Sequence, residues 1–155
     1  MAKMTNYTPT QFMHKIFLAL LISFNSSAFA GPTNYGNATV SEVTTIYDGD
    51  TFRATIKGWP PLIGEHIPIR VNGVDTPEMR GKCKQEVALA RKAKKHTVSM
   101  LRLGKVITLE NMKRGKYFRI VADVYIDGSS LTESLIKADL GIPYHGKTKT
   151  KNWCK

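Results

Sequence analysis

The groups best suited to metal or phosphate chemistry lie within nine consecutive positions, from Arg70 to Glu78. Asp75 and Glu78 supply carboxylates, and Arg70 supplies a guanidinium. Pro77 has no backbone N–H and favours an extended Thr76, which ends the preceding strand and leaves the Thr76 carbonyl free to face outward. Carboxylate and carbonyl oxygens are the ligands that hard cations prefer. The stretch therefore predicts a site for a hard cation with an arginine beside it.

A second acidic cluster, Asp48-Gly49-Asp50-Thr51, lies about twenty residues upstream. If the two clusters meet in space, Asp50, Asp75 and Glu78 concentrate negative charge, which is costly unless a cation binds there. The candidate ligands are oxygens, with no Cys or His nearby in the sequence except His66, so Ca²⁺ or Mg²⁺ fits and Zn²⁺ does not. For Asp-Gly alone, the alternative is an ordinary hairpin turn.

Arg70 and Arg119 are the arginines that could hold a phosphate. A guanidinium stays charged and donates two parallel hydrogen bonds to phosphate oxygens. Attack on a phosphodiester adds charge to those oxygens in the transition state, which a cation and two guanidinium groups stabilise, while a nearby carboxylate takes the proton of the attacking water. For either arginine alone, a surface salt bridge is the alternative.

The elements that must position these groups follow from the apolar pattern. Alternation predicts five strands, over residues 40–47, 51–57, 67–71, 106–112 and 119–126. An apolar stripe ending before Gly104 predicts a helix over residues 84–103. A capping box at residues 130–133 predicts a second helix, which ends near Leu140. Residues 58–65 are predicted to form a loop.

This element order predicts a mainly β protein with helices (α+β). The architecture that fits is a five-stranded OB-fold barrel with one helix after strand 3 and one after strand 5, a fold that often binds oligonucleotides. Other small barrels would also fit five short strands.

Three segments of the chain carry a resemblance to a known family. They are YDGDTF (residues 47–52), IRVNGVDTPEMR (residues 69–80) and RGKYFRIVADVYIDG (residues 114–128). In this order and spacing they resemble the active-site segments of the staphylococcal nuclease (thermonuclease) family, over about residues 40–144. The resemblance implies the same OB-fold.

The resemblance also implies roles for individual residues. Arg70 and Arg119 match residues that hold the scissile phosphate, and Glu78 matches the residue that activates the attacking water. Asp50, Asp75 and the carbonyl of Thr76 match Ca²⁺ ligands. Lys116 and Tyr117 match residues that contact a terminal phosphate of a bound nucleotide, and Tyr144 could offer a ring for base stacking, with a buried bracing tyrosine as the alternative. The family cleaves DNA and RNA and leaves 3′-phosphate ends.

Two departures from the family pattern affect how far these roles carry over. Phe118 stands between Tyr117 and Arg119 where the family has a small residue, which could change the position of Arg119. Only fifteen residues follow Leu140, so the long C-terminal helix of the family prototype has no room.

The N-terminus has the pattern of a secretory signal peptide. Residues 1–30 contain no acidic residue, an apolar run at residues 16–24, and Ala28-Phe29-Ala30 as a cleavage site. An uncleaved anchor helix is the alternative, and translation could start at Met1 or Met13. We expect a signal peptide (1–30), a flexible lead-in (31–39), a staphylococcal-nuclease-like domain (40–145) and a basic tail (146–155).

Charge and cysteine content fit an exported protein that binds a polyanion. The chain has a net charge of +11; cleavage removes two of its 23 basic residues and none of its 12 acidic ones, leaving +9. Nucleic acid is the commonest partner of such a domain, although a merely soluble basic surface is possible. Cys83 and Cys154 are the two cysteines, and in an exported protein they are expected to form a disulfide, with two unpaired thiols as the alternative.

Together these features predict an exported, Ca²⁺-dependent endonuclease acting on DNA, RNA or both, periplasmic or secreted. We expect a monomer with no stable membrane association after signal cleavage. One alternative is a non-catalytic OB-fold module that binds nucleic acid or another polyanion, and a third is a metal-dependent phosphodiesterase for small nucleotides. A binding module has no need to keep Asp50, Arg70, Asp75, Glu78 and Arg119 together.

Overall fold

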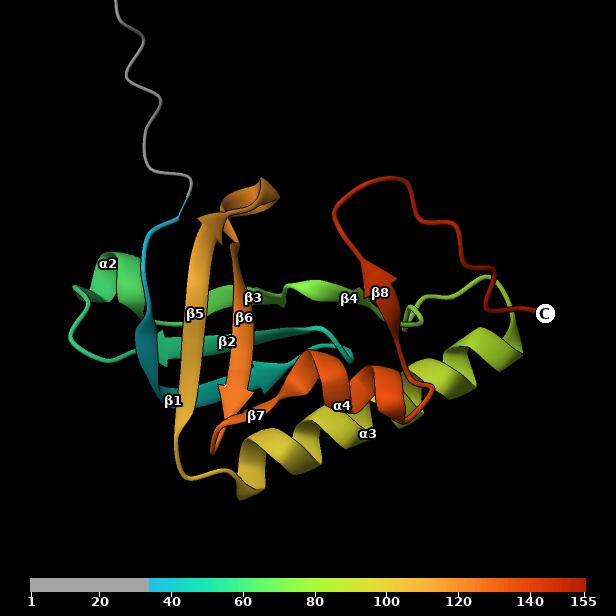
Figure 1. Cartoon of the computed structure of the whole chain (residues 1–155), viewed down its shortest axis with the longest axis horizontal. Coiled ribbons are helices and arrows are strands. Elements are labelled where there is room, and N and C mark those ends of the chain that lie inside the picture. The colour runs from blue at the N-terminus through green and yellow to red at the C-terminus, as the bar shows by residue number, and fades with distance from the viewer. Residues whose placement is uncertain (1–33) are drawn as a thin grey trace, which may run out of the picture. The chain divides into compact units, whose positions relative to one another are not determined.

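The structure, a computed structural model, describes residues 34–155 (Figure 1). The predicted signal peptide and the start of the predicted lead-in therefore lie outside the described residues. Within residues 34–155, no helix is long and apolar enough to cross a membrane.

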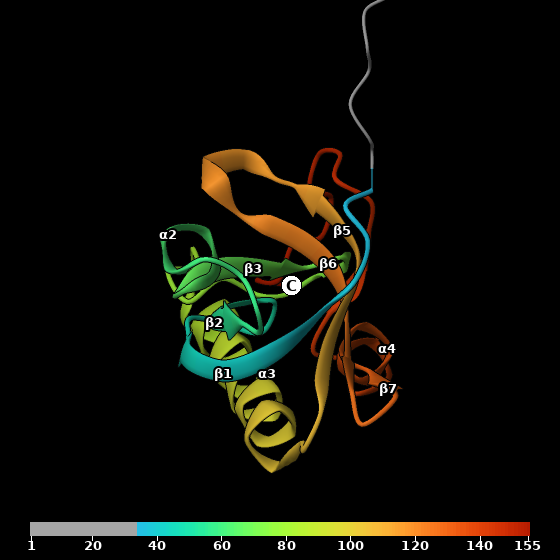
Figure 2. The same cartoon turned by 90° about the vertical axis from the view of Figure 1, so that its left-hand side faces the viewer.

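Five strands form a closed barrel: β1 (Ala38–Ile46), β2 (Thr51–Ile56), β3 (Ile67–Val71), β5 (Ile107–Arg114) and β6 (Ile120–Ile126). They follow the order β3-β2-β1-β5-β6, and a parallel pairing of β3 with β6 closes the sheet. The other pairs in the barrel are antiparallel. Figure 2 shows these strands curving around a common interior. The predicted α+β class and five-stranded OB-fold barrel are thus confirmed.

Alternate side chains of the strands fill the barrel. In β6 the buried residues are Ile120, Ala122, Val124 and Ile126, and in β3 they are Ile67, Ile69 and Val71. Successive side chains of a strand point to opposite faces. Arg70, between two buried residues of β3, is therefore carried on the outer face of the barrel, where it can meet a substrate.

Two helices pack together on one side of the barrel (Figure 1). The first, α3 (Lys84–Leu103), has the predicted bounds and buries a stripe that includes Ala90, Ala93 and Leu101. The second, α4 (Leu131–Lys137), is capped as predicted, because the hydroxyl of Ser130 accepts a hydrogen bond from the Glu133 N–H at 3.2 Å. A hydrogen bond of 2.8 Å between His96 and Ser134 joins the helices.

Several local elements differ from the sequence-based expectation, among them the short strands β4 (Gly73–Asp75), β7 (Ser129–Ser130) and β8 (Ile142–Tyr144), which were not predicted. Residues 58–65 contain a short helix, α2 (Pro61–Gly64), whose first-turn proline is preset for a helix start. Helix α4 ends at Lys137 instead of near Leu140, because Asp139 adopts a left-handed conformation with φ of 55°. The strand β5 extends to Arg114, and the connection to β6 is a 3₁₀ turn, η1 (Lys116–Phe118).

The C-terminal tail is fastened to the domain at both of its ends. Directly before the tail, β8 (Ile142–Tyr144) pairs with β4 (Gly73–Asp75). A separate short strand, β7 (Ser129–Ser130), pairs with β6 before α4 begins. At the far end, the structure contains the predicted disulfide between Cys83 and Cys154, beside a Trp153 that is only 8% exposed. The tail is therefore held close to the start of α3.

We expect this disulfide to contribute substantially to stability. Replacing both Cys83 and Cys154 by Ser should lower the free energy of unfolding by about 4 kcal/mol, because the bond restricts a loop of 71 residues in the unfolded chain. Serine can still cap α3, so the cap is not lost with the bond. Urea unfolding of the double variant and of chemically reduced wild type should give the same loss. If the free energy of unfolding of the double variant were within about 1 kcal/mol of that of the oxidised wild type, this expectation would be contradicted.

Candidate active site

The fold brings the two acidic clusters of the sequence together. Asp50 is the last residue of the β1–β2 turn and is 1% exposed, whereas Asp75 ends β4 and is 2% exposed. The backbone N–H of Thr76 donates to Asp50 Oδ2 at 3.1 Å, which joins the two segments directly. The three predicted metal ligands therefore lie in one buried cluster.

Helix α3 holds the acidic turn against β4. Thr97 Oγ1 donates to the carbonyl of Gly49 at 2.7 Å. A side chain at position 49 would not fit, because its Cβ would lie 2.9 Å from Ala93 Cβ and 2.9 Å from Thr76 Cγ2. Glycine is therefore required in this turn by close packing.

Arg70 bridges the two buried carboxylates. Its Nη1 lies 2.5 Å from Asp50 Oδ1, and its Nη2 lies 3.2 Å from Asp75 Oδ1. The side chain is 16% exposed and lines a surface cavity of about 700 Å³. The guanidinium is thus held in place by the carboxylates and is accessible from the cavity.

Asp48 is a further buried carboxylate, which belongs to the second acidic cluster of the sequence but was not among the predicted metal ligands. It is 3% exposed, and its Oδ1 accepts a hydrogen bond from the Asp50 N–H at 3.1 Å. Burial raises the pKa of the Asp48 carboxyl above its usual value. The repeated Asp in Asp48-Gly49-Asp50 is the signal that could have pointed to it.

The residues of this cluster fit a hard divalent cation. Burial raises the pKa of Asp50 to about 7, and the attraction of Arg70 only partly offsets this effect. The buried Thr76 Oγ1 has no hydrogen-bond partner among the described residues. Buried carboxylate oxygens next to an unsatisfied hydroxyl form a set of oxygen donors of the kind that Ca²⁺ or Mg²⁺ binds.

Glu78 lies at the rim of the cavity, with its side chain 45% exposed. A buried glutamate of α3, Glu86, anchors the loop that carries it, because Glu86 Oε2 accepts the Lys82 N–H at 2.8 Å and Oε1 accepts the Glu78 N–H at 3.5 Å. Gly81 packs so closely that a Cβ there would lie 2.5 Å from Glu86 Cγ. The position of Glu78 therefore depends on α3.

Lys149, from the C-terminal tail, reaches into the same cluster. Its ammonium lies 2.8 Å from Asp75 Oδ1 and also forms an ion pair with Glu78 Oε1. Burial alone would lower the pKa of Lys149, but the hydrogen bonds to the two carboxylates outweigh burial and raise it. Sequence reasoning placed Lys149 in a basic tail and did not predict this contact.

The β5–β6 connection supplies the second predicted arginine. Arg119 directly precedes β6, and its Nε donates to the carbonyl of Lys116 at 3.3 Å. Tyr117 and Phe118 both adopt left-handed backbone conformations, with φ of 56° and 60°. The centre of the Phe118 ring lies 4.2 Å from the guanidinium carbon of Arg114, so the bulky side chain at position 118 packs against Arg114.

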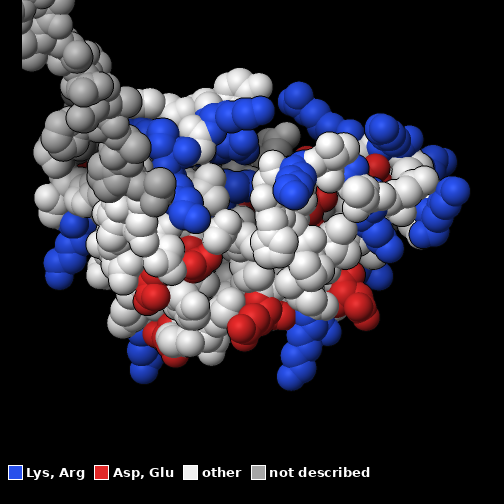
Figure 3. Space-filling view, turned by 45° about the horizontal axis from the view of Figure 1, so that its top comes forward, with Lys and Arg blue, Asp and Glu red and all other residues white. Residues whose placement is uncertain are grey.

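One cavity collects most of the predicted phosphate and substrate residues. Its lining includes Arg70, Glu78, Lys116, Arg119 and Tyr144. Tyr144 is half-buried, and its hydroxyl donates to the carbonyl of Lys147 at 2.5 Å. Tyr117 does not line this cavity; it lines a neighbouring groove. Lys and Arg side chains gather over the upper part of the face shown in Figure 3, with a few carboxylates visible between them.

A comparison with family models decides the family. Residues 68–152 match the model described as staphylococcal nuclease homologue. The chain belongs to the staphylococcal nuclease family. Members of this nuclease-like family are generally metal-dependent, and nucleic acid is the substrate that such a domain implies. Asp48 and Asp50 precede the matched range, but the fold places Asp50 against its Thr76, and Arg70 bridges Asp50 to its Asp75.

In this family member, Lys149 should oppose cation binding. Its ammonium lies on an Asp75 oxygen that would otherwise be available to a divalent cation, so Lys149→Met should tighten divalent-cation binding by about 3- to 10-fold. Calorimetric titration with Ca²⁺ measures this directly. Lys147→Met is the matched control, since it removes the same charge from an exposed residue of the same tail. Equal Ca²⁺ affinity in wild type and Lys149→Met would contradict the expectation.

Proposed function

We propose that this protein is an exported, Ca²⁺-dependent endonuclease that hydrolyses phosphodiester bonds of DNA and RNA and leaves 3′-phosphate ends. The observation that carries the proposal is the common cavity: Arg70, Glu78 and Arg119 line it, and the buried carboxylates of Asp50 and Asp75 contact Arg70 at its edge. A site for phosphodiester hydrolysis needs a phosphate grip, a base and charge stabilisation. This cavity offers all three. The family to which the chain belongs also implies nucleic acid as the substrate.

Each residue has a defined part in this proposal. Arg70 and Arg119 donate hydrogen bonds to the oxygens of the scissile phosphate and stabilise the charge that builds there in the transition state. Glu78 takes the proton of the attacking water, for which its exposure at the cavity rim is suitable. Asp50, Asp75 and the carbonyl of Thr76 would hold Ca²⁺. When bound, Ca²⁺ would supply positive charge next to the phosphate and make the attacking water more acidic.

Export is the second part of the proposal. The signal-peptide pattern of residues 1–30 and the Cys83–Cys154 disulfide both suit an oxidising compartment, either the periplasm or the medium. We infer that the mature chain begins near Gly31 and works as a monomer.

A nuclease assay of the mature chain, residues 31–155, tests the function. Plasmid DNA, single-stranded DNA and RNA should all be cleaved internally in Ca²⁺, not in EDTA, and more slowly in Mg²⁺, with products that carry 3′-phosphates. Inactivity in every metal would overturn the proposal, and tight binding without cleavage would favour the OB-fold binding module instead. Products with 5′-phosphates would overturn the proposed direction of bond cleavage.

A further inference from the structure

A second groove, of about 420 Å³, lies beside the candidate active site. It is bounded by the end of β1, the start of β2, helix α3 and the tip of the β5–β6 hairpin. Tyr47, Thr51 and Arg119 line both this groove and the active-site cavity, so the two hollows adjoin at these residues. A polymer held at the scissile phosphate could therefore continue into this groove.

Two exposed aromatic rings border the groove. The exposed fractions are 51% for Tyr47 and 86% for Tyr117. Neither ring is buried enough to brace the barrel, and the guanidinium carbon of Arg119 lies 5.7 Å from the centre of the Tyr117 ring. Exposed tyrosines beside cations are the usual stacking platforms for unpaired bases.

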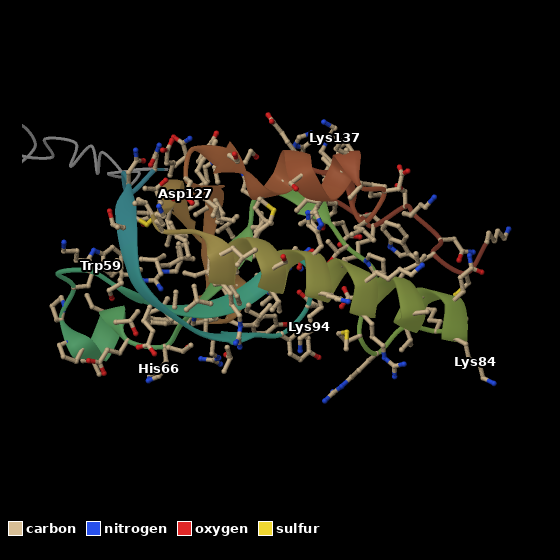
Figure 4. The ribbon with its side chains drawn as sticks, turned by 90° about the horizontal axis from the view of Figure 1, so that it is seen from below. Trp59, His66, Lys84, Lys94, Asp127 and Lys137 are labelled. Atoms are coloured by element: carbon tan, nitrogen blue, oxygen red, sulfur yellow. A yellow bond between two sulfur atoms is a disulfide. The ribbon has the colours of Figure 1, made fainter. Side chains whose placement is uncertain are left out.

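The charge of the groove is uniformly positive. Its lining contains Arg53, Lys94 and Arg119 but no Asp or Glu. Arg53 Nη1 donates to the carbonyl of His66 at 2.9 Å, and within residues 34–155 neither Arg53 nor Lys94 forms an ion pair with a carboxylate. Lys94 lies in the middle of α3 (Figure 4). These cations are thus available for an anionic polymer.

We propose that this groove binds the nucleotides that flank the scissile phosphate of a single-stranded nucleic acid. Tyr47 and Tyr117 stack on the bases, and Arg53 and Lys94 contact the phosphates. For Tyr117 this role differs from the phosphate contact that the family resemblance implies. The strand must be unpaired, since a base within a duplex is already stacked on its neighbours and does not offer its face to a tyrosine. This inference rests on the proposed function, because it takes the neighbouring cavity as the site of cleavage.

Binding measurements with oligonucleotides of two lengths test this groove. In a Glu78→Gln background, which slows cleavage by about 100-fold or more, an eight-nucleotide oligothymidylate should bind at least about 10-fold more tightly than a dinucleotide, because only the octamer reaches the groove. Adding Tyr47→Ala and Lys94→Ala together should weaken octamer binding by about 10-fold or more, and should change dinucleotide binding much less. A duplex of the same length should gain little from the groove.

Matched variants separate stacking and local charge from general effects. Tyr47→Phe keeps the ring and should retain octamer affinity. Lys92→Ala removes the same charge from an exposed residue of the same helix and should have little effect. Thermal unfolding of each variant checks the fold. Unchanged octamer binding in the Tyr47→Ala, Lys94→Ala variant, or an equal loss in Lys92→Ala, would overturn the inference.

A failure of the groove inference can be distinguished from a failure of the proposed nuclease function. If the wild type cleaves nucleic acid and the groove variants bind like their parent, the groove inference fails and the nuclease function stands. If the wild type cleaves nothing but octamer binding still depends on Tyr47 and Lys94, the groove is supported and the catalytic proposal fails.

Discussion

Replacing Glu78 by Gln is expected to reduce turnover by about 100-fold or more, with little change in the binding of Ca²⁺ or nucleic acid. The amide keeps the shape of the side chain but cannot accept the proton of the attacking water. Glu78 is half-exposed at the cavity rim, whereas the proposed Ca²⁺ ligands are buried behind it, so the ligand set should survive the change. Single-turnover cleavage and calorimetric titration with Ca²⁺ measure the two effects separately.

A matched control for Glu78→Gln is Glu65→Gln, which removes the same charge from an exposed residue outside the cavity. It should leave cleavage unchanged. If Glu78→Gln keeps near wild-type turnover, Glu78 is not the base. If it loses Ca²⁺ binding in parallel with activity, Glu78 belongs to the ligand set instead.

Replacing Arg119 by Ala is expected to lower kcat by about 10²- to 10³-fold while KM changes much less. The reason is that Arg119 would act mainly on charge that develops in the transition state. Arg119→Lys should restore little of this rate, because an ammonium cannot donate the two parallel hydrogen bonds of a guanidinium. Steady-state kinetics on a single-stranded substrate resolve kcat from KM.

Lys113→Ala provides the control for Arg119, since Lys113 lies on the same hairpin but outside the active-site cavity. It should weaken substrate binding slightly, through loss of one positive charge, with kcat unchanged. Near wild-type activity in Arg119→Ala would contradict the assigned role. Full rescue by Arg119→Lys would mean that charge alone is needed there.

The barrel and the long helix could be predicted because their signals are local. The alternation along β6 and the apolar stripe of α3 can each be recognised within one short stretch of sequence. Both elements have bounds close to the expected ones. The ends of elements depended on single backbone conformations instead. Asp139 ends α4 early because it adopts a positive φ, which Asp tolerates. Nothing in the residues around Asp139 predicts this conformation.

The core of the candidate site could also be anticipated. Strand β3 carries Arg70 on its outer face by simple alternation, and the acidic clusters lie at neighbouring turns. What escaped prediction were contacts set by tertiary packing. Lys149 meets Glu78 across 71 residues of sequence only because β8 and the disulfide fasten the tail beside α3. The burial of Asp48 likewise depends on the fold around it.

The most direct test of the account follows Ca²⁺ binding and cleavage in the same samples. In the wild type, cleavage rate should rise with Ca²⁺ over the same concentration range in which calorimetry detects one bound ion per chain. In Asp75→Asn both curves should shift together to higher Ca²⁺, because a buried ligand charge has been removed. Cleavage that persists in EDTA, or an Asp75→Asn rate curve that coincides with that of the wild type, would contradict the account.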